Sequence, residues 1–182
     1  GLGGGDVVVA SSTVDVDGRG RLSVDGVDVR VPLRGAHNLR NATLALAVAR
    51  ELGVSTDDAA RGIARMAPPP MRSIIEHIGR ATLINDAYNS NPGSARAALE
   101  LLVRVGQGRM RVAVLGTMLE LGPAGPALHD ELARAALDAG IELIAGVGEF
   151  GAALTRVGAP PGRVVSAADA DAIWAPIASR LT

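Results

Sequence analysis

Short apolar segments separated by polar turn residues open the chain, and apolar and polar positions alternate most clearly from Val27 to Val31. Strict alternation is typical of a strand that has one face on a core and the other in water. Asp17-Gly18 and Asp25-Gly26 fall between the later segments, where hairpin turns are required. The pattern therefore predicts an antiparallel ribbon, with strands at 7–10, 13–16, 22–24 and 27–31.

Two helices are predicted after the ribbon. The first opens within the Gly35–Asn41 stretch, where Asn38 can serve as the N-cap, and it runs to about Leu52. The second spans about 55–66, and the serine at its start forms a partial capping box with Asp58.

The 67–71 segment, which contains three consecutive prolines, separates two kinds of pattern. Consecutive prolines cannot continue a helix and form a stiff spacer, so we place a domain boundary between 1–66 and 72–182. Beyond the spacer, apolar strands without alternation take turns with helices, which predicts an α/β domain whose parallel sheet has helices on both faces. Strands are expected at 81–86, 110–115, 142–147 and 163–166, and helices at 93–105, 125–139, 149–157 and 168–180.

A dense polar stretch, Asn85-Asp86-Ala87-Tyr88-Asn89-Ser90-Asn91, lies between the 81–86 strand and the 93–105 helix. It brings a carboxylate, a phenol, a hydroxyl and several amides together, while Asn91 suits a helix N-cap and Pro92 the first helical turn. Because ligands bind beyond the carboxyl ends of strands in open α/β sheets, the stretch is a candidate ligand site. The alternative is an Asx-rich turn that only caps the helix.

Composition excludes several classes of function. The chain has no cysteine for disulfide or thiolate chemistry, and its net charge of −1 with scattered arginines does not indicate a nucleic-acid surface. No stretch is long and apolar enough to cross a membrane. The chain has no lysine, so the Gly1–Gly5 run cannot belong to a Walker A loop. The three histidines are too dispersed for a metal site, and His129 is expected on a solvated helix face.

Four motifs occur in a fixed order: Gly35-Ala-His37-Asn38-x-x-Asn41, then Arg72, then Asn85-Asp86-x-Tyr88-Asn89-x-Asn91-Pro92, then Val114-Leu115-Gly116-x-Met118-Leu119-Glu120-Leu121-Gly122. With these motifs the chain resembles the Mur ligases, most closely the MurF type, over about 7–151. Each motif alone would be a weak signal, but the shared order makes the resemblance specific. Asn85 and Thr117 depart from it, since aspartate is common at both positions.

The resemblance implies that 1–66 is the end of a central ATPase domain and that 72–182 is a Rossmann-like C-terminal domain, truncated before its end. It implies ATP-dependent amide formation through an acyl phosphate, joining D-alanyl-D-alanine to UDP-N-acetylmuramoyl-tripeptide in bacterial peptidoglycan synthesis. ATP with Mg²⁺ would be required, with the metal site mainly outside this chain. We expect a cytoplasmic monomer that binds neither nucleic acid nor membrane, and no complete catalytic set or ligase activity in this piece alone.

Site residues follow from the same resemblance. The expected nucleotide-binding residues are His37, Asn38, Asn41, Arg72 and Asp86, and the expected substrate-binding residues are Tyr88, Asn89, Ser90 and Asn91. Amides suit a base edge because one group both donates and accepts, a carboxylate suits ribose hydroxyls, and a guanidinium suits phosphate.

Other interpretations stay open. Asn38 could only cap its helix, His37 could be an ordinary loop histidine, and Arg72 could be an interdomain salt-bridge partner. Glu120 could be a substrate-side carboxylate or could belong to a structural strand-to-loop turn. The protein could be another Mur ligase subtype or a non-catalytic descendant. Gly146–Gly151 matches the dinucleotide fingerprint G-x-G-x-x-G, which leaves an NAD-binding module as a remote alternative, although the match falls in the third strand-helix unit rather than the first.

Overall fold

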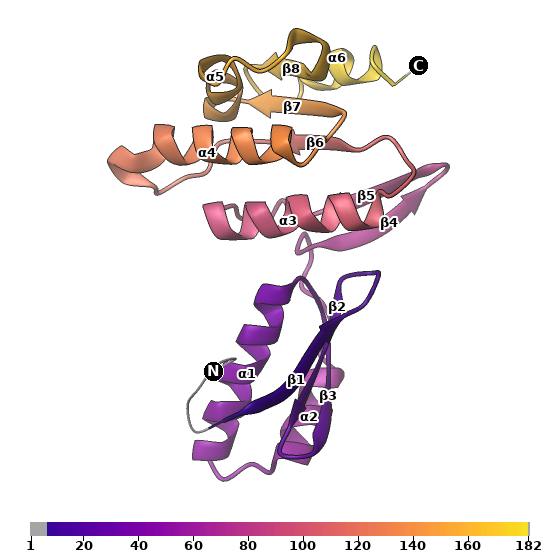
Figure 1. The fold of residues 1–182 in the computed structure, drawn as a ribbon, viewed down its shortest axis with the longest axis vertical. Helices are drawn as coiled ribbons and strands as arrows, with labels where there is room; N and C mark the ends of the chain where they lie inside the picture. Colours follow the sequence, from indigo (N-terminus) through magenta and orange to yellow (C-terminus); the bar gives the residue numbers. More distant parts are fainter. Residues whose placement is uncertain (1–6, 182) are drawn as a thin grey trace. The chain divides into compact units, whose positions relative to one another are not determined.

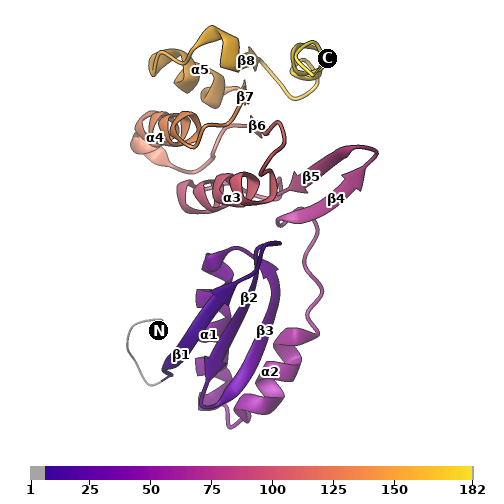
Figure 2. The same ribbon diagram turned by 45° about the vertical axis from the view of Figure 1, so that its right-hand side comes forward.

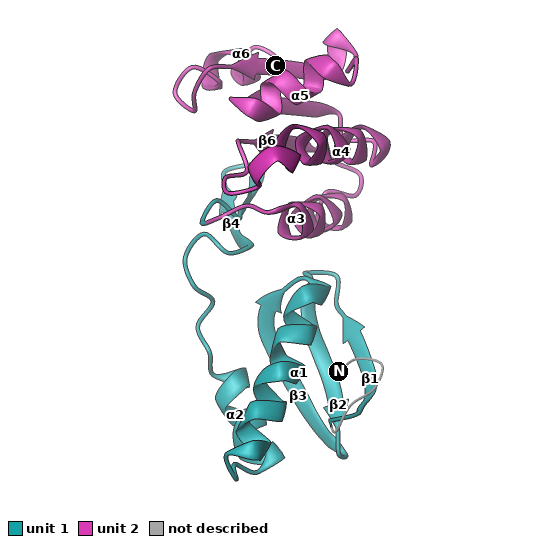
Figure 3. Ribbon diagram, turned by 90° about the vertical axis from the view of Figure 1, so that its left-hand side faces the viewer, with its two compact units in different colours: residues 1–88 teal, residues 89–182 magenta. Residues whose placement is uncertain are grey.

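The computed structural model describes residues 7–181, so the Gly1–Gly5 run lies outside the described residues. Contacts divide the chain into two compact units, 1–88 and 89–182, which Figure 3 colours separately. The division falls after Tyr88, later than the 67–71 spacer. The domain limits expected from the sequence therefore stay a prediction, and each unit is described by itself.

The first unit opens with an antiparallel sheet in the order β1 (Val9–Val14), β2 (Arg19–Val24) and β3 (Val27–Arg34). Helix α1 (Ala36–Glu51) covers one face of this sheet, and α2 (Thr56–Ala64) lies alongside β3 (Figures 1 and 2). The antiparallel ribbon and both helices are thus confirmed.

Alternation along the strands builds the core of this sheet. Leu22, Val24, Val29 and Val31 are buried against α1, while the residues between them face outward. The predicted segments at 7–10 and 13–16 are not two strands. A single strand, β1, includes part of each and keeps pairing with β2 past a register shift near its start.

A second small sheet was not expected. β4 (Ile74–Ile78) and β5 (Ala81–Asn85) form an antiparallel hairpin, so the prediction that 81–86 belongs to the parallel sheet was wrong. The two-residue Gly79-Arg80 turn explains the difference, because Gly79 has the positive φ (57°) that a type II′ hairpin turn requires at its first position. The pairing runs in full register from Ile78 with Ala81 at the turn to Ile74 with Asn85 at the open end.

The second unit is a three-stranded parallel sheet in the order β6 (Val112–Leu115), β7 (Leu143–Val147) and β8 (Val164–Ala167). Its helices are α3 (Pro92–Val105), α4 (Gly125–Asp138), α5 (Glu149–Arg156) and α6 (Trp174–Ala178), with short 3₁₀ turns η1 (Gly122–Ala124) and η2 (Pro161–Arg163). Helix α6 is shorter than the expected 168–180 segment, because the Asp169 carboxylate accepts the backbone N–H groups of Asp171 and Ala172 and forms a turn first.

Helices cover both faces of this parallel sheet, although Val114 on the edge strand β6 is 55% exposed. Ala113 and Ile144 point to the layer of α3, α4 and α5, where Phe150 is fully buried. Leu143 and Ala145, the alternate positions, point to α6 and contact a cluster that includes Ile177. The α/β class with helices on both faces is therefore confirmed, since apolar residues at consecutive positions supply both layers.

Two of the three predicted N-cap residues, Ser55 and Asn91, are confirmed. The Asn91 side chain accepts the Ser94 N–H in a reciprocal capping box that opens α3. At α2 the Ser55 hydroxyl accepts the Asp58 N–H. The prediction of Asn38 as an N-cap was wrong, because α1 already begins at Ala36 and has no side-chain cap.

Glycine contacts at the β7–α5 crossing generate the first prediction. A Cβ atom on Gly146 would lie 2.7 Å from Leu154 Cδ1 and 2.8 Å from Gly151 Cα. We expect Gly146→Ala to lower the free energy of unfolding by roughly 1–3 kcal/mol through overpacking. Gly162→Ala is the matched control, because a Cβ there would meet nothing within 4 Å. Equal melting temperatures for the two variants would contradict this packing.

The Arg111–Glu142 pair generates a pH prediction. Arg111 donates from Nη2 and Nε to the two Glu142 carboxylate oxygens at 2.8 and 3.0 Å, and this pairing lowers the Glu142 pKa from 4.5 to about 2. Because the folded-state pKa is depressed, the stabilisation is present above the unfolded pKa and is lost as the pH falls from about 4.5 towards 2.

Glu142→Gln should therefore lower the melting temperature modestly at neutral pH, and the difference from the native chain should vanish towards pH 2. The control is Glu131→Gln, which changes an exposed carboxylate on α4. A constant difference across the acid range would rule out this linkage.

Candidate functional site

The first group of expected nucleotide-binding residues lies at the start of α1. The Asn38 amide donates to the backbone carbonyl of Arg34 at 2.7 Å and lies 3.0 Å from His37 Nε2. The Asn41 side-chain amide in turn donates from Nδ2 to the side-chain oxygen Oδ1 of Asn38 at 3.0 Å. Asn38 is thus occupied as a brace between α1 and β3, whereas the exposed Asn41 keeps its carbonyl oxygen for a ligand.

The second group lies where the spacer meets the hairpin. Asp86 Oδ1 accepts both the backbone N–H of Ser73 at 2.7 Å and its hydroxyl at 3.1 Å. The Tyr88 N–H donates to the Met71 carbonyl. We call the 71–73 and 86–88 segments together the Asp86 clamp. Both Asp86 bonds use one oxygen, so Oδ2 has no hydrogen-bond partner within the described residues.

Arg72 projects from the clamp. Its guanidinium carbon lies 4.5 Å from the centre of the Tyr88 ring, a cation–π contact between two exposed side chains. The residues on either side, Met71 and Ser73, both have positive φ values (55° and 49°). Such backbone is strained for residues other than glycine, and strain of this kind gathers at functional sites. The hydrogen bonds of Met71 with Tyr88 and of Ser73 with Asp86 therefore fix the backbone on either side of Arg72.

Arg34 connects the two groups. Its backbone carbonyl accepts from Asn38, while its side chain donates from Nη1 to the Ser73 carbonyl at 3.1 Å and from Nε to the Asp17 carbonyl. Arg34 and Ser73 were missed by the sequence analysis. The available signal was the position of Arg34 directly before the Gly35–Asn41 motif and that of Ser73 directly after Arg72.

Partial burial and neighbouring charges both act on the Arg34 guanidinium. Burial lowers the pKa of its guanidinium, and the charge of Arg19 lowers it further, while Asp17 and Asp15 act in the opposite direction. Because a guanidinium does not lose its proton in proteins, Arg34 acts as a donor to both carbonyls.

The substrate-binding stretch is divided between the two units. Tyr88 belongs to the first unit, whereas Asn89, Ser90 and Asn91 belong to the second. Asn91 is committed to the α3 capping box, and the Asn89 side chain accepts the Ser90 N–H. Of these residues, Asn91 therefore has a clear structural task, as the Asx-turn alternative anticipated.

His129 was expected to be solvated, and this was wrong. It is only 1% exposed, its Nε2 accepts the Met118 N–H at 2.8 Å, and its Nδ1 donates to the Gly125 carbonyl at 2.7 Å. The ring therefore fixes the loop after β6 onto α4. The sequence did not predict this role because His129 lies one residue away from the apolar positions of α4. The loop after β6 covers that side of the helix and so buries the ring.

The dinucleotide-like glycines have a packing explanation. Gly146 and Gly151 let β7 and α5 approach closely, as shown above, and Gly148 has a positive φ of 60° where the chain turns. The Thr117 hydroxyl accepts the N–H of Glu149 at 3.0 Å, so a side chain already occupies the first turn of α5. These contacts favour a structural role for the fingerprint.

Metal and membrane features complete the description. Between residues 7 and 181, no three His, Asp or Glu side chains gather as metal ligands. Among the same residues, no helix is long and apolar enough to span a membrane. His77 pairs across the hairpin with Thr82.

Residues 71–177 match a family model described as Mur ligase, glutamate ligase domain. The chain is 37% identical over 124 residues to the UDP-N-acetylmuramoyl-tripeptide–D-alanyl-D-alanine ligase of Escherichia coli (strain K12), a match that covers 68% of this chain and 27% of that relative. It is 35% identical over 155 residues to the ligase of the same name from Mycobacterium tuberculosis (strain ATCC 25618 / H37Rv), covering 79% of this chain and 30% of the relative.

A crystal structure of MurF from Acinetobacter baumannii has the same fold, with a TM-score of 0.83 and 30% identity over 98% of this chain and 39% of that one. The chain therefore spans less than a third of the two curated relatives. The resemblance drawn from the four motifs is confirmed.

The position of Arg34 generates a prediction for the clamp. Arg34→Gln cannot reach both carbonyls and should lower the free energy of unfolding by about 1–3 kcal/mol, since the Ser73 carbonyl loses a charged donor. Amide hydrogen exchange should accelerate in 71–73 and 86–88. Arg40→Gln, which changes an exposed arginine on α1, should alter neither quantity. Unchanged exchange in the Arg34 variant would show that the clamp holds without it.

Proposed function

This chain belongs to the Mur ligase family, and from that premise we propose that it serves in an ATP-dependent ligase that joins D-alanyl-D-alanine to UDP-N-acetylmuramoyl-tripeptide. The curated relatives above carry that name, at 35–37% identity. Because the chain covers less than a third of their length, the activity of a whole enzyme is an inference. The proposal includes a bacterial cytoplasmic protein that acts as a monomer.

The Asp86 clamp is the observation that carries the proposal. Ser73 holds one carboxylate oxygen of Asp86 and leaves the other able to accept from ribose hydroxyls. A carboxylate fixed in this way has its orientation set before a ligand arrives, which reduces the entropy lost on binding.

The other nucleotide residues divide into direct and supporting roles. We assign the adenine edge to the exposed Asn41, whose amide group can both accept and donate. Asn38 and His37 support Asn41 through the hydrogen bonds at the start of α1. Arg72 carries a permanent charge next to the clamp, so we assign it to the nucleotide phosphates.

The reaction consists of two displacements. The tripeptide carboxylate takes the γ-phosphoryl group of ATP to give an acyl phosphate and ADP, and the amine of D-alanyl-D-alanine then attacks the acyl carbon and expels phosphate. Positioning and charge neutralisation dominate catalysis of this type. Mg²⁺ would neutralise phosphate charge, but the described residues hold no ligand cluster that fits it, so we assign no metal ligand in this chain.

Tyr88 links the nucleotide side to the peptide side. Its ring lies under the Arg72 guanidinium, and the three residues after it complete the proposed substrate stretch, Asn89, Ser90 and Asn91. A phosphate that draws Arg72 away would free the face of the ring for the peptide substrates. The remote alternative of an NAD-binding module has less support, because the glycines on which it rests are explained by β7–α5 packing.

Asp86 offers a sharp test in an intact ligase that contains this chain. In Asp86→Asn the amide oxygen can still accept from Ser73, whereas the other position becomes a donor and no longer accepts from ribose. The charge-assisted hydrogen bond lost at this position is worth roughly 1.5–3 kcal/mol. The apparent ATP requirement should therefore rise by about one to two orders of magnitude, with binding of the UDP-sugar peptide and the melting temperature nearly unchanged.

Two further variants separate structure from binding. Asp86→Ala removes both oxygens and should lower the melting temperature as well as ATP affinity. Ser73→Ala removes only the hydroxyl contact and should have a smaller effect on both. If folded Asp86→Asn enzyme bound ATP as tightly as the native enzyme, the ribose assignment would be wrong.

A further inference from the structure

A group of three arginines lies on the outer face of the first sheet. Arg21 on β2 and Arg30 on β3 are direct partners across the two strands, so their side chains leave the same face side by side. Arg19 points to that face from two residues earlier on β2. Like charges directly opposite each other destabilise a strand pair, so this arrangement requires an explanation beyond sheet stability.

The three guanidinium groups have no hydrogen-bond or ion-pair partner within residues 7–181. Some arginine side chains of the described chain do find partners, such as Arg34, Arg111 and Arg163. Within the same residues Arg40 and Arg134 are exposed without one, but each stands on its own helix, whereas the three arginines here share one face of a sheet. The nearest outward carboxylate on the same strands is Asp28, which lies opposite Ser23 rather than opposite an arginine and forms no salt bridge there.

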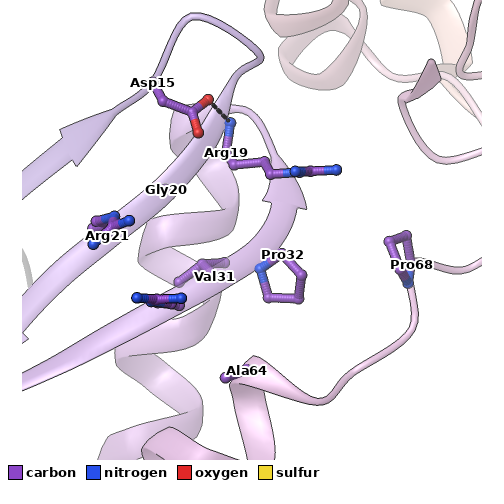
Figure 4. A pocket seen from close by; sticks show the side chains of 9 residues that line it. Asp15, Arg19, Gly20, Arg21, Val31, Pro32, Ala64 and Pro68 are labelled. Carbon is purple, nitrogen blue, oxygen red and sulfur yellow. Dashed lines mark hydrogen bonds between the residues drawn. The ribbon is translucent and has the colours of Figure 1, made fainter.

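A depression of about 340 Å³ lies beside these arginines (Figure 4). It is lined by Arg19, Arg21 and Arg30 and is bounded by Pro32, by Ala64 at the end of α2 and by Pro68 in the spacer. Asp15 is its only acidic lining residue, and one of its oxygens accepts the Arg19 backbone N–H at 2.8 Å. Figure 4 shows the Arg19 side chain extending away from that carboxylate.

Electrostatics supports an excess of positive charge here. The charge of Arg19 helps to depress the pKa of Arg34, its partner in the strand register. Three unpaired guanidinium groups around a hollow supply planar donor forks that match phosphate oxygens. A group of this charge and shape would neutralise the Arg21–Arg30 repulsion that the free chain carries.

We propose that the depression lined by Arg19, Arg21 and Arg30 is a second anion site, which binds a phosphate or pyrophosphate group. None of its lining residues belongs to the proposed nucleotide or substrate set. The site therefore does not depend on the proposed ligase function. Inorganic phosphate, pyrophosphate and a nucleoside diphosphate share the required chemistry.

Calorimetric titration of the full 182-residue chain tests the proposal with inorganic phosphate, pyrophosphate and UDP as probes. Pyrophosphate should bind at one site, and Arg21→Gln with Arg30→Gln should weaken it by at least about tenfold, since two charge-assisted contacts are lost. The melting temperature of this double variant should stay equal or rise, because a like-charge pair is removed. Arg134→Gln on α4 is the matched control for lost positive charge and should bind pyrophosphate normally.

Saturating adenosine, which lacks phosphate and would occupy only the proposed adenine and ribose residues, should not displace pyrophosphate. This arm separates failure of the anion site from failure of the nucleotide assignment. Comparison of the three probes identifies the source, because a nucleoside contribution would make UDP bind more tightly than pyrophosphate. Absence of pyrophosphate binding, or equal binding by the double variant and the Arg134 control, would overturn the proposal. Binding of an acidic peptide in place of all three probes would overturn the phosphate assignment and favour a protein partner.

Discussion

The proposed nucleotide site depends on Arg34, whose guanidinium donates to the backbone carbonyls of Asp17 and Ser73. Arg34 ends β3, accepts from Asn38 through its own carbonyl and reaches the Ser73 carbonyl with its guanidinium. Backbone carbonyls that are partly buried need donors, and a guanidinium can supply several at fixed angles. This contact brings the end of the first sheet, the start of α1 and the spacer into one connected group, so residues far apart in sequence acquire defined positions.

The hairpin of β4 and β5 gives this group its second anchor. Its open end places Asp86 next to Ser73, because the pairing of Ile74 with Asn85 leaves the residues just outside the ladder facing one another. The positive φ values at Met71 and Ser73 are held by this pairing on one side and by Arg34 on the other. Local strain is stable only where the surroundings determine it in this way.

Local pattern predicted most of the elements but not their partners. The caps at Ser55 and Asn91 were predictable because a cap depends on three or four neighbouring residues. The parallel sheet and its two buried faces followed from runs of apolar residues. The hairpin pairing of 81–85 follows from the local Gly79-Arg80 turn, a signal that the apolar run of the strand outweighed. Burial of His129 depends on how a loop packs on its helix, and the bridging by Arg34 joins segments far apart in sequence, neither of which is encoded in periodicity. The family resemblance supplied candidate residues, and the structure showed which of them brace the others.

Asp86 shows why a residue can be structural and ligand-binding without conflict. One oxygen accepts two bonds from Ser73, which fixes the carboxylate plane, and the second oxygen then points in a direction set by that plane. A serine at this position could not serve both tasks, and an asparagine would turn the outer acceptor into a donor. The requirement for an aspartate therefore arises from the two roles together, so loss of stability on truncation is no argument against nucleotide binding. Only a substitution that preserves the hydrogen bonds with Ser73 can test the contribution of the second oxygen to ribose binding.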